Sequence, residues 1–222
     1  PQTIYVFGVN DDVADDNQPY TVVLTINAGS TNPLSGYKDA DPDDVAATNI
    51  DDDVPGLIVS AISRATTEAG GNATFAVTLK SQPTADVTYT LTSSDATEGD
   101  VTIPAGKTVT FTAANWNTNQ TVTVTGIDDL FVDGNVNYQI NINNGSSTDP
   151  KYNNLFGTSV AAVNNDNDVA GIEVVQISSA TSENLGTASF KVRMTSQPAT
   201  DSRLTDVVVI NVASNNTNEG TV

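Results

Sequence analysis

The residues best suited to chemistry in this sequence are aspartates that gather in short loops. GIDDLFVDGN, residues 126–135, places Asp128, Asp129 and Asp133 within six positions and contains no Lys or Arg. VNDDVADDN, residues 9–17, repeats the pattern near the start of the chain. Two like charges about 4 Å apart repel each other by roughly 1 kcal/mol even in water, and a divalent cation held by several oxygen ligands removes this repulsion. The spacing therefore predicts metal sites built from carboxylates.

The composition limits the metals and reactions that the chain can support. It has 27 acidic and 8 basic residues, a net charge of −19, and neither His nor Cys. Catalytic thiols, Ser-His-Asp triads, disulfides and the usual zinc and copper sites are therefore excluded. Oxygen ligands remain, and these suit Ca²⁺ and Mg²⁺. The surplus of negative charge argues against partners such as nucleic acid or an anionic membrane surface.

The apolar residues indicate a folded chain. They make up 38% of the sequence and alternate with Thr and Asn in clear runs, which favours β structure over disorder. No apolar run reaches the length of about eighteen residues that a membrane-spanning helix needs. The first residues, PQTIYVF, lack the Met and basic region of a signal peptide, so we expect the start to lie inside a longer protein.

The sequence repeats itself at long intervals. DDDVPGLIV at 51–59 matches DNDVAGIEV at 166–174, and GVNDD at 8–12 matches GIDDL at 126–130. Repeats of this length indicate a tandem array of whole domains rather than a solenoid. The predicted boundaries are 1–54 for the C-terminal part of one repeat, 55–168 for a complete repeat, and 169–222 for the N-terminal part of a third.

The complete repeat carries the period-two pattern of half-buried strands. Phe75, Val77 and Leu79 alternate with Thr and Ala, and comparable alternation recurs along the repeat, with no helical stripe. Seven short strands of this kind predict an all-β fold of tandem immunoglobulin-like antiparallel β-sandwiches. The predicted strands span residues 56–62, 72–79, 86–92, 108–113, 120–126, 136–142 and 157–163.

The two partial repeats, each expected to contribute three strands, would expose unpaired sheet edges. Two interpretations follow. The chain is a window on a longer array, or the partial repeats complete each other between neighbouring molecules and the protein associates head to tail.

Most of the acidic residues fall in loops expected at one end of the sandwich. Loops after the first, third and fifth strands, and the exit after the seventh, lie at the same end of such a fold. In the complete repeat these loops hold Glu68, Asp95, Glu98, Asp100, Asp128, Asp129, Asp133, Asp166 and Asp168. The partial repeats contribute Asp11, Asp12, Asp15, Asp16, Asp51, Asp52, Asp53, Glu183 and Glu219. Bound cations would explain this clustering, and the alternative is a solvated acidic surface that favours solubility.

The complete repeat resembles the Calx-beta family, the sandwich domain of sodium–calcium exchangers and many bacterial surface proteins. The resemblance lies in TTEAGG with Glu68, SSDATEG with Asp95, the turn DDLFVD, and the closing triplet at 166–168. It implies Ca²⁺ as the cofactor. The implied ligands are Glu68, Asp95, Asp128, Asp129, Asp133, Asp166 and Asp168, with Asp11, Asp15, Asp51, Asp52, Asp53 and Glu183 in the partial repeats.

Three departures from the family pattern qualify the implied sites. Val136 stands where members with several ions carry another acid, which predicts fewer ions. Asn10 replaces the first Asp of the turn in the first repeat. Asn216 stands opposite Asp95 in the third repeat, which predicts a weaker site there.

These features predict a non-enzymatic, calcium-stapled structural or adhesive region of a large extracellular bacterial surface protein, such as a stalk, filament or adhesin. Its expected partners are neighbouring repeats and a host, surface or polysaccharide ligand. One alternative is a calcium-sensing regulatory module. Another is a carbohydrate-binding or hydrolysing sandwich, although such sites usually add aromatic platforms and Trp116 is the only Trp.

Overall fold

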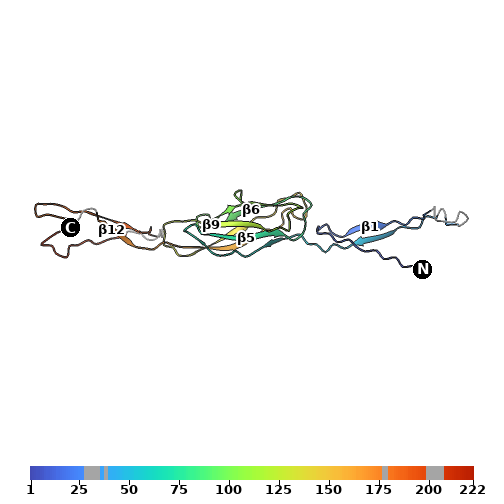
Figure 1. The fold of residues 1–222 in the computed structure, drawn as a ribbon, viewed down its shortest axis with the longest axis horizontal. Coiled ribbons are helices and arrows are strands. Elements are labelled where there is room, and N and C mark those ends of the chain that lie inside the picture. The colour runs from blue at the N-terminus through green and yellow to red at the C-terminus, as the bar shows by residue number, and fades with distance from the viewer. Residues whose placement is uncertain (28–35, 38–39, 177–179, 199–207) are drawn as a thin grey trace.

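The computed structural model describes residues 1–27, 36–37, 40–176, 180–198 and 208–222, and every regular element among them is a β-strand. Three parts follow one another along an elongated molecule (Figure 1). We call them the N-terminal segment (residues 1–54), the central unit (55–168) and the C-terminal segment (169–222). The prediction of an all-β chain is confirmed. Within the described ranges, no helix has the length and apolar character needed to cross a membrane.

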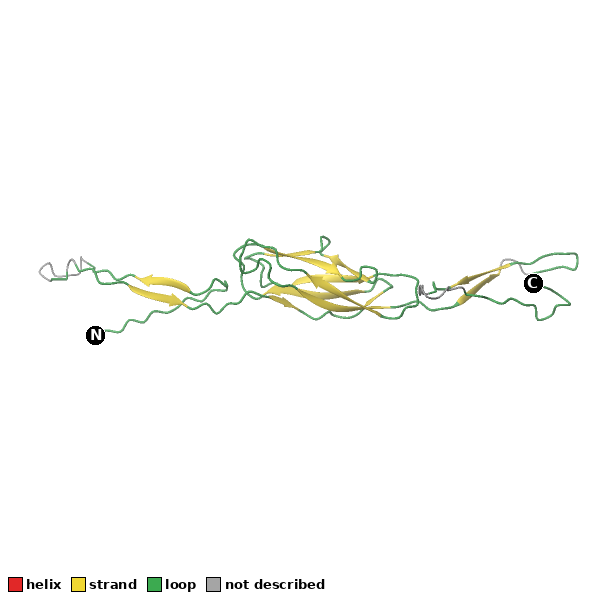
Figure 2. Ribbon diagram, turned by 180° about the vertical axis from the view of Figure 1, so that it is seen from behind, coloured by secondary structure: helices red, strands yellow, loops and turns green. Residues whose placement is uncertain are grey.

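The central unit contains a five-stranded and a four-stranded sheet (Figure 2). The larger sheet has the order β4–β11–β10–β6–β8, and the smaller has the order β3–β5–β9–β7. Neighbouring strands are antiparallel except β4 and β11, which run parallel. The strands are β3 (Leu57–Val59), β4 (Thr66–Thr67), β5 (Asn72–Leu79), β6 (Val87–Ser93), β7 (Gly99–Ile103), β8 (Thr108–Phe111), β9 (Gln120–Gly126), β10 (Val136–Ile142) and β11 (Thr158–Asn165).

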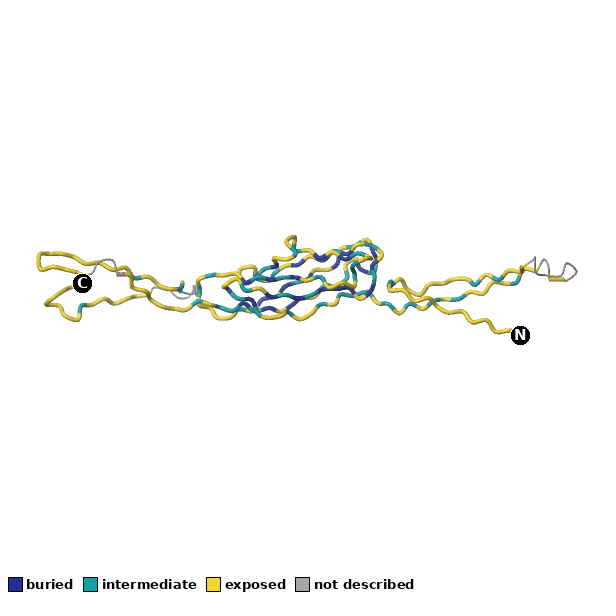
Figure 3. Tube along the Cα trace, in the orientation of Figure 1, coloured by how far each residue is buried: buried dark blue, intermediate teal, exposed yellow. Residues whose placement is uncertain are grey.

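One hydrophobic core joins these two sheets (Figure 3). Phe75 and Val77 of β5 belong to the same buried cluster as Tyr89 of β6 and Ile140 of β10. The period-two pattern explains this arrangement, since alternate residues of each strand point to one face. Trp116 packs against the cluster. Burying these side chains removes apolar surface from water, which is the main favourable term in folding the unit.

The strand predictions match the structure closely for the long strands and fail for two short ones. The predicted ranges 72–79, 120–126 and 136–142 coincide with β5, β9 and β10. The sequence predicts no strand at β7, whose one buried apolar side chain is that of Val101 and whose pairing with β9 is irregular between Val101 and Ile103. β4 lies beyond the first predicted strand, 56–62: the chain leaves one sheet after β3 and joins the other through the two residues of β4.

The described residues of each flanking segment form one antiparallel pair, where three strands are predicted. β1 (Gln18–Val22) pairs with β2 (Val45–Asn49), and β12 (Ile172–Gln176) pairs with β13 (Phe190–Met194). Apolar residues of the remaining runs stay exposed, such as Phe7 at 82% and Val209 at 75%. An extended run becomes a strand only when a neighbour pairs with its backbone, and the described residues supply no such neighbour there.

Candidate metal centre

Two groups of carboxylates lie at one end of the central unit. The first group is Glu68, Asp166 and Asp168, and the second is Glu98, Asp129 and Asp133. In each group, one carboxylate oxygen from every residue lies within 4.8 Å of the others. Four separate segments supply the residues: the turn after β4, the turn before β7, the loop after β9, and the exit from β11.

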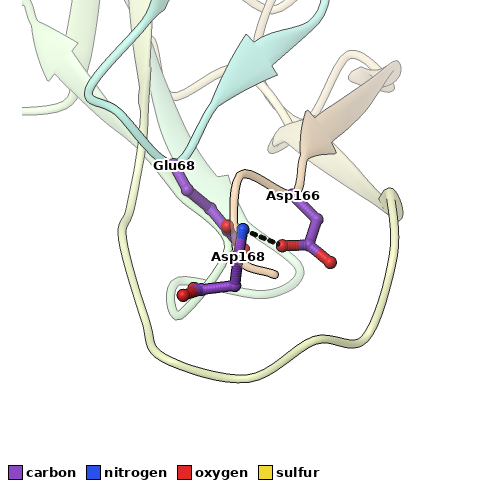
Figure 4. A group of neighbouring side chains, drawn as sticks. All are labelled: Glu68, Asp166 and Asp168. Carbon is purple, nitrogen blue, oxygen red and sulfur yellow. Dashed lines mark hydrogen bonds between the residues drawn. The ribbon is translucent and has the colours of Figure 1, made fainter. Parts of the chain in front are cut away.

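Backbone hydrogen bonds hold the first group together (Figure 4). The parallel pairing of β4 with β11 continues as the Glu68 N–H donates to the Asn165 carbonyl over 3.1 Å, which brings Glu68 beside the exit of β11. The Glu68 carboxylate, only 2% exposed, accepts the Asn167 N–H at 2.9 Å. Asp166 Oδ1 accepts the Asp168 N–H at 2.7 Å, and its Oδ2 accepts the Gly134 N–H at 2.8 Å. Glu68 and Asp166 are thereby fixed in position.

The second group joins the turn before β7 to the loop after β9. Glu98 is 6% exposed, and its Oε2 lies 3.4 Å from the side-chain amide nitrogen of Asn164. Asp129 Oδ1 accepts the Phe131 N–H at 2.7 Å, which closes a tight turn around this carboxylate. Asp133 is exposed at the rim. The group therefore combines one buried, one half-buried and one exposed carboxylate.

Burial and neighbouring charge disfavour the ionised form of three of these carboxylates, Glu68, Glu98 and Asp168. Burial raises the pKa of Glu68, and the negative charges of Asp166 and Asp129 raise it further. Burial likewise raises the pKa of Glu98 and of Asp168, with neighbouring aspartates adding to the effect. Three ion pairs occur among the described residues, and all of them involve acids outside the two groups: Lys107–Asp100, Lys151–Asp16 and Arg193–Glu173.

The residues present fit a hard divalent cation. Every donor is oxygen, and two of the six carboxylates are buried, which is costly for an anion without a partner. Asp168 Oδ2 is also buried and has no hydrogen-bond partner among the described residues. An oxygen in that position can be satisfied by a cation. The two acidic groups could therefore hold a metal ion.

The structure separates the predicted ligands into those that it brings together and those that it does not. Glu68, Asp129, Asp133, Asp166 and Asp168 fall within the two groups. Asp128 lies beside them, with its Oδ1 3.3 Å from the Asn167 side-chain nitrogen. Asp95 is in neither group.

Sequence reasoning did not select Glu98 as a ligand, although it placed this residue in the correct loop. The signal that could have found it is Glu219, the glutamate of NTNEG at 216–220, a stretch that is similar to DATEG at 95–99.

The acidic residues of the N-terminal segment reproduce part of this arrangement. Its predicted ligands line one hollow of about 290 Å³. The Asp53 N–H donates to Asp51 Oδ1 at 2.9 Å and the Asp16 N–H to Asp51 Oδ2 at 2.7 Å, as Asp168 and Gly134 do to Asp166. The residues that line the hollow include Asp11, Asp15, Asp51, Asp52 and Asp53.

The C-terminal segment reproduces the two glutamates of the arrangement. Glu183 and Glu219 line one hollow of about 530 Å³. They stand at the positions that Glu68 and Glu98 hold in the central unit. The turn at Glu183 is also alike, because the Gly186 N–H donates to Ser182 Oγ as the Gly71 N–H donates to Thr67 Oγ1, both at 3.1 Å.

Comparison with known proteins adds no relatives: no protein-family model matches the chain, and no curated protein matches it in sequence. The Calx-beta resemblance therefore stays a prediction that rests on the quoted motifs.

Proposed function

We propose that this chain is a calcium-stapled structural or adhesive region of a large extracellular bacterial surface protein, built from tandem immunoglobulin-like, Calx-beta-like sandwiches. One observation carries the proposal: six carboxylates from four separate segments converge at one end of the central unit, and the ion pairs of the described residues all involve other acids. Such an arrangement is unfavourable for the bare protein and favourable once a cation binds.

Calcium suits these ligands better than magnesium. Ca²⁺ accepts many oxygen ligands in flexible geometry, whereas Mg²⁺ demands a near-ideal octahedron and keeps several waters. The two groups mix buried and exposed carboxylates and lie beside the Ile127 carbonyl and the side-chain amide oxygen of Asn135, which matches the calcium preference. Millimolar calcium outside cells also suits the weak sites of extracellular modules.

The position of the ligands explains how they would stabilise the unit. Glu68 and Asp166 continue from β4 and β11 of the five-stranded sheet, while Glu98 and Asp129 adjoin β7 and β9 of the four-stranded sheet. A bound cation supplies positive charge at this end. The carboxylates that bind it then connect the ends of the two sheets.

The junctions between the three parts support a tandem array whose partners are neighbouring repeats. At the first junction the Gln82 N–H donates to the Asp12 carbonyl, and at the second the Gln197 N–H donates to the Leu130 carbonyl, both at 2.6 Å. Parallel bridges accompany them, joining Val13 to Gln82 and Phe131 to Gln197. The same contact at both junctions is expected of a regular stalk or filament.

The carbohydrate-binding alternative receives less support. Its aromatic platform would need an exposed ring near the acidic groups, but Trp116 packs against the hydrophobic core. The extracellular location, the bacterial source and any adhesive ligand follow from the family resemblance and the calcium requirement, and they belong to the same proposal.

Thermal unfolding tests the proposal directly. Near-UV dichroism, which senses Trp116 and the buried tyrosines, follows the central unit in excess Ca²⁺, in Mg²⁺, and in a chelator. Calcium at about 100 times its dissociation constant adds roughly 2.7 kcal/mol of stability, so we expect the midpoint to rise by about 5 °C or more.

Two variants serve as controls for this melt. Asp129→Asn removes a ligand and should abolish most of the calcium-dependent rise. Asp86→Asn removes an exposed acid outside both groups and should leave the rise unchanged. An unfolding midpoint that does not change with calcium would show that the acidic loops are a solvated surface and not a metal site.

A further inference from the structure

We infer that the turn before β7 supplies its metal ligand from Glu98, that Asn164 positions this carboxylate, and that Asp95 serves the turn instead. The inference rests on the proposed function, since it assigns roles within the same cation site. It reverses the assignment that the family resemblance implies, because that pattern points to Asp95.

One oxygen of the Asp95 carboxylate is engaged by its own turn, and Asp95 belongs to neither carboxylate group. Its Oδ1 accepts the Thr97 N–H at 3.0 Å and the Thr97 hydroxyl at 2.5 Å. The backbone of Asp95 is also engaged, since its N–H donates to Ser93 Oγ at 3.2 Å and its carbonyl accepts the Gly99 N–H at 3.2 Å. This is an Asx turn, in which a side-chain oxygen replaces a backbone acceptor. The side chain therefore shapes the turn that presents Glu98.

The third repeat separates the role of shaping the turn from the role of supplying a charged ligand. Asn216 stands at the position of Asp95 and makes the same turn: the Asn218 N–H donates to Asn216 Oδ1, and the Asn216 N–H donates to Ser214 Oγ, both at 3.2 Å. The turn therefore needs an acceptor oxygen but no charge. The charge is retained three residues later, where Glu219 matches Glu98 and lines one hollow with Glu183.

Glu98 has the geometry of a ligand. A carboxylate oxygen of Glu98 lies within 4.8 Å of those of Asp129 and Asp133. The side chain is 6% exposed, so water offers it little compensation for its charge. The group that donates to its carboxylate is a neutral amide, Asn164 Nδ2 at 3.4 Å.

A buried polar network fixes the orientation of Asn164. The residue is 1% exposed, and its Oδ1 lies 3.0 Å from Thr66 Oγ1, which in turn lies 2.9 Å from the Tyr138 hydroxyl. Its Nδ2 donates to the Ile127 carbonyl at 3.1 Å and faces Glu98. With the oxygen directed to Thr66, the amide nitrogen must point towards Glu98. Asn164 is therefore a positioning residue behind the ligand.

Calcium titration calorimetry on the 222-residue chain tests the inference, with near-UV dichroism as the check on folding. We expect Glu98→Gln to weaken calcium binding on the order of tenfold or more, because ligand charge sets affinity in such sites. Asp95→Asn, which copies the third repeat, should change affinity by less than about twofold because the turn acceptor remains. If Glu98→Gln does not fold, Glu98→Asp keeps the charge, shortens its reach and should also weaken binding.

A double-mutant cycle tests the positioning role. Asn164→Leu should weaken binding about tenfold, as loss of such supporting residues commonly does. In the Glu98→Gln background the same change should cost little more, whereas a purely structural role would give additive losses.

The outcomes separate the two proposals. Strong loss from Asp95→Asn with little from Glu98→Gln overturns this inference and leaves the calcium staple standing. Additive losses in the cycle overturn the role of Asn164 alone. A wild-type chain that binds no calcium overturns both the inference and the proposed function.

Discussion

Glu68 and Glu98 are the residues on which the chemistry of this end of the unit depends. Both are buried carboxylates, at 2% and 6% exposure, among aspartates of the same charge. Burial raises the pKa of each, and neighbouring aspartates raise it further. Asp166 differs, because the N–H groups of Asp168 and Gly134 lower its pKa. The site thus combines two acids with raised pKa values, Glu68 and Glu98, and one with a lowered pKa, Asp166.

This difference predicts how the metal-free protein responds to pH. A raised pKa in the folded state contributes stability that is fully present below the usual value of 4.5 and is lost as pH rises through the folded pKa. Lowering the pH from 7 to 5 in a chelator should therefore raise the unfolding midpoint. The lowered pKa of Asp166 acts in the opposite direction, but only below its usual 3.8, outside this window.

The measurement is a series of melts between pH 5 and 7, with and without calcium. Glu68→Gln should be more stable than wild type in chelator at pH 7 and should show a flatter pH response. Excess calcium should remove the dependence in wild type. A metal-free midpoint that falls steadily from pH 7 to 5 would contradict the electrostatic account.

At the scale of the elements, the two acidic groups meet where the end of β9 packs against β4 and β11. Gly126 ends β9 where a Cβ atom would lie 2.3 Å from the Thr67 carbonyl oxygen and 2.4 Å from Asn164 Oδ1. Only glycine permits this approach, which places the Ile127 carbonyl within reach of Asn164. Packing of the strands and positioning of Glu98 therefore depend on the same contact.

Gly126→Ala should consequently lower the free energy of unfolding by about 1–3 kcal/mol, since the added methyl forces the backbone apart. Urea unfolding of the metal-free chain measures the loss, and calcium affinity should fall with it. Gly106→Ala is the matched control, because its Cβ would meet only Thr108 Oγ1, at 3.6 Å. An equal effect of the two substitutions would show that the strands are not tightly packed there.

At the scale of the whole molecule, the acidic turn of the N-terminal segment, which we propose carries ligands, also touches the central unit. Asp12 and Val13 contact Gln82, and Ala14 follows at 6% exposure, the one buried residue that the structure describes outside the central unit. The ion pair between Lys151 and Asp16 spans the same junction at 2.5 Å. If a cation fixes one side of this turn and the contact with Gln82 fixes the other, the angle between the N-terminal segment and the central unit is restricted.

Ala14→Gln should therefore loosen the first junction without unfolding the central unit. In ¹⁵N relaxation of the calcium-bound chain, we expect β1 and β2 to reorient together with β5 in wild type and independently in the variant. Ala46→Gln, an exposed change in β2, is the control. Independent motion already present in wild type would count against a stiff stalk.

The sequence by itself determined the strands and the end of the unit to which the acids belong. Strict alternation in β5, β9 and β10 reflects one buried and one solvated face, a property that each segment carries locally. The matching stretches 51–59 and 166–174 likewise indicated the repeat, and the same hydrogen bonds recur around Asp51 and Asp166.

Only the tertiary structure decided which acids meet. Asp95 and Glu98 stand three residues apart in one loop, and no local pattern shows that the first caps its own turn while the second points towards Asp129 and Asp133. That choice depends on Asn164, 66 residues from Glu98 along the chain, and on the strand packing that buries it. Alternation is a local property of each strand, whereas ligand geometry depends on distances between segments that only folding brings together.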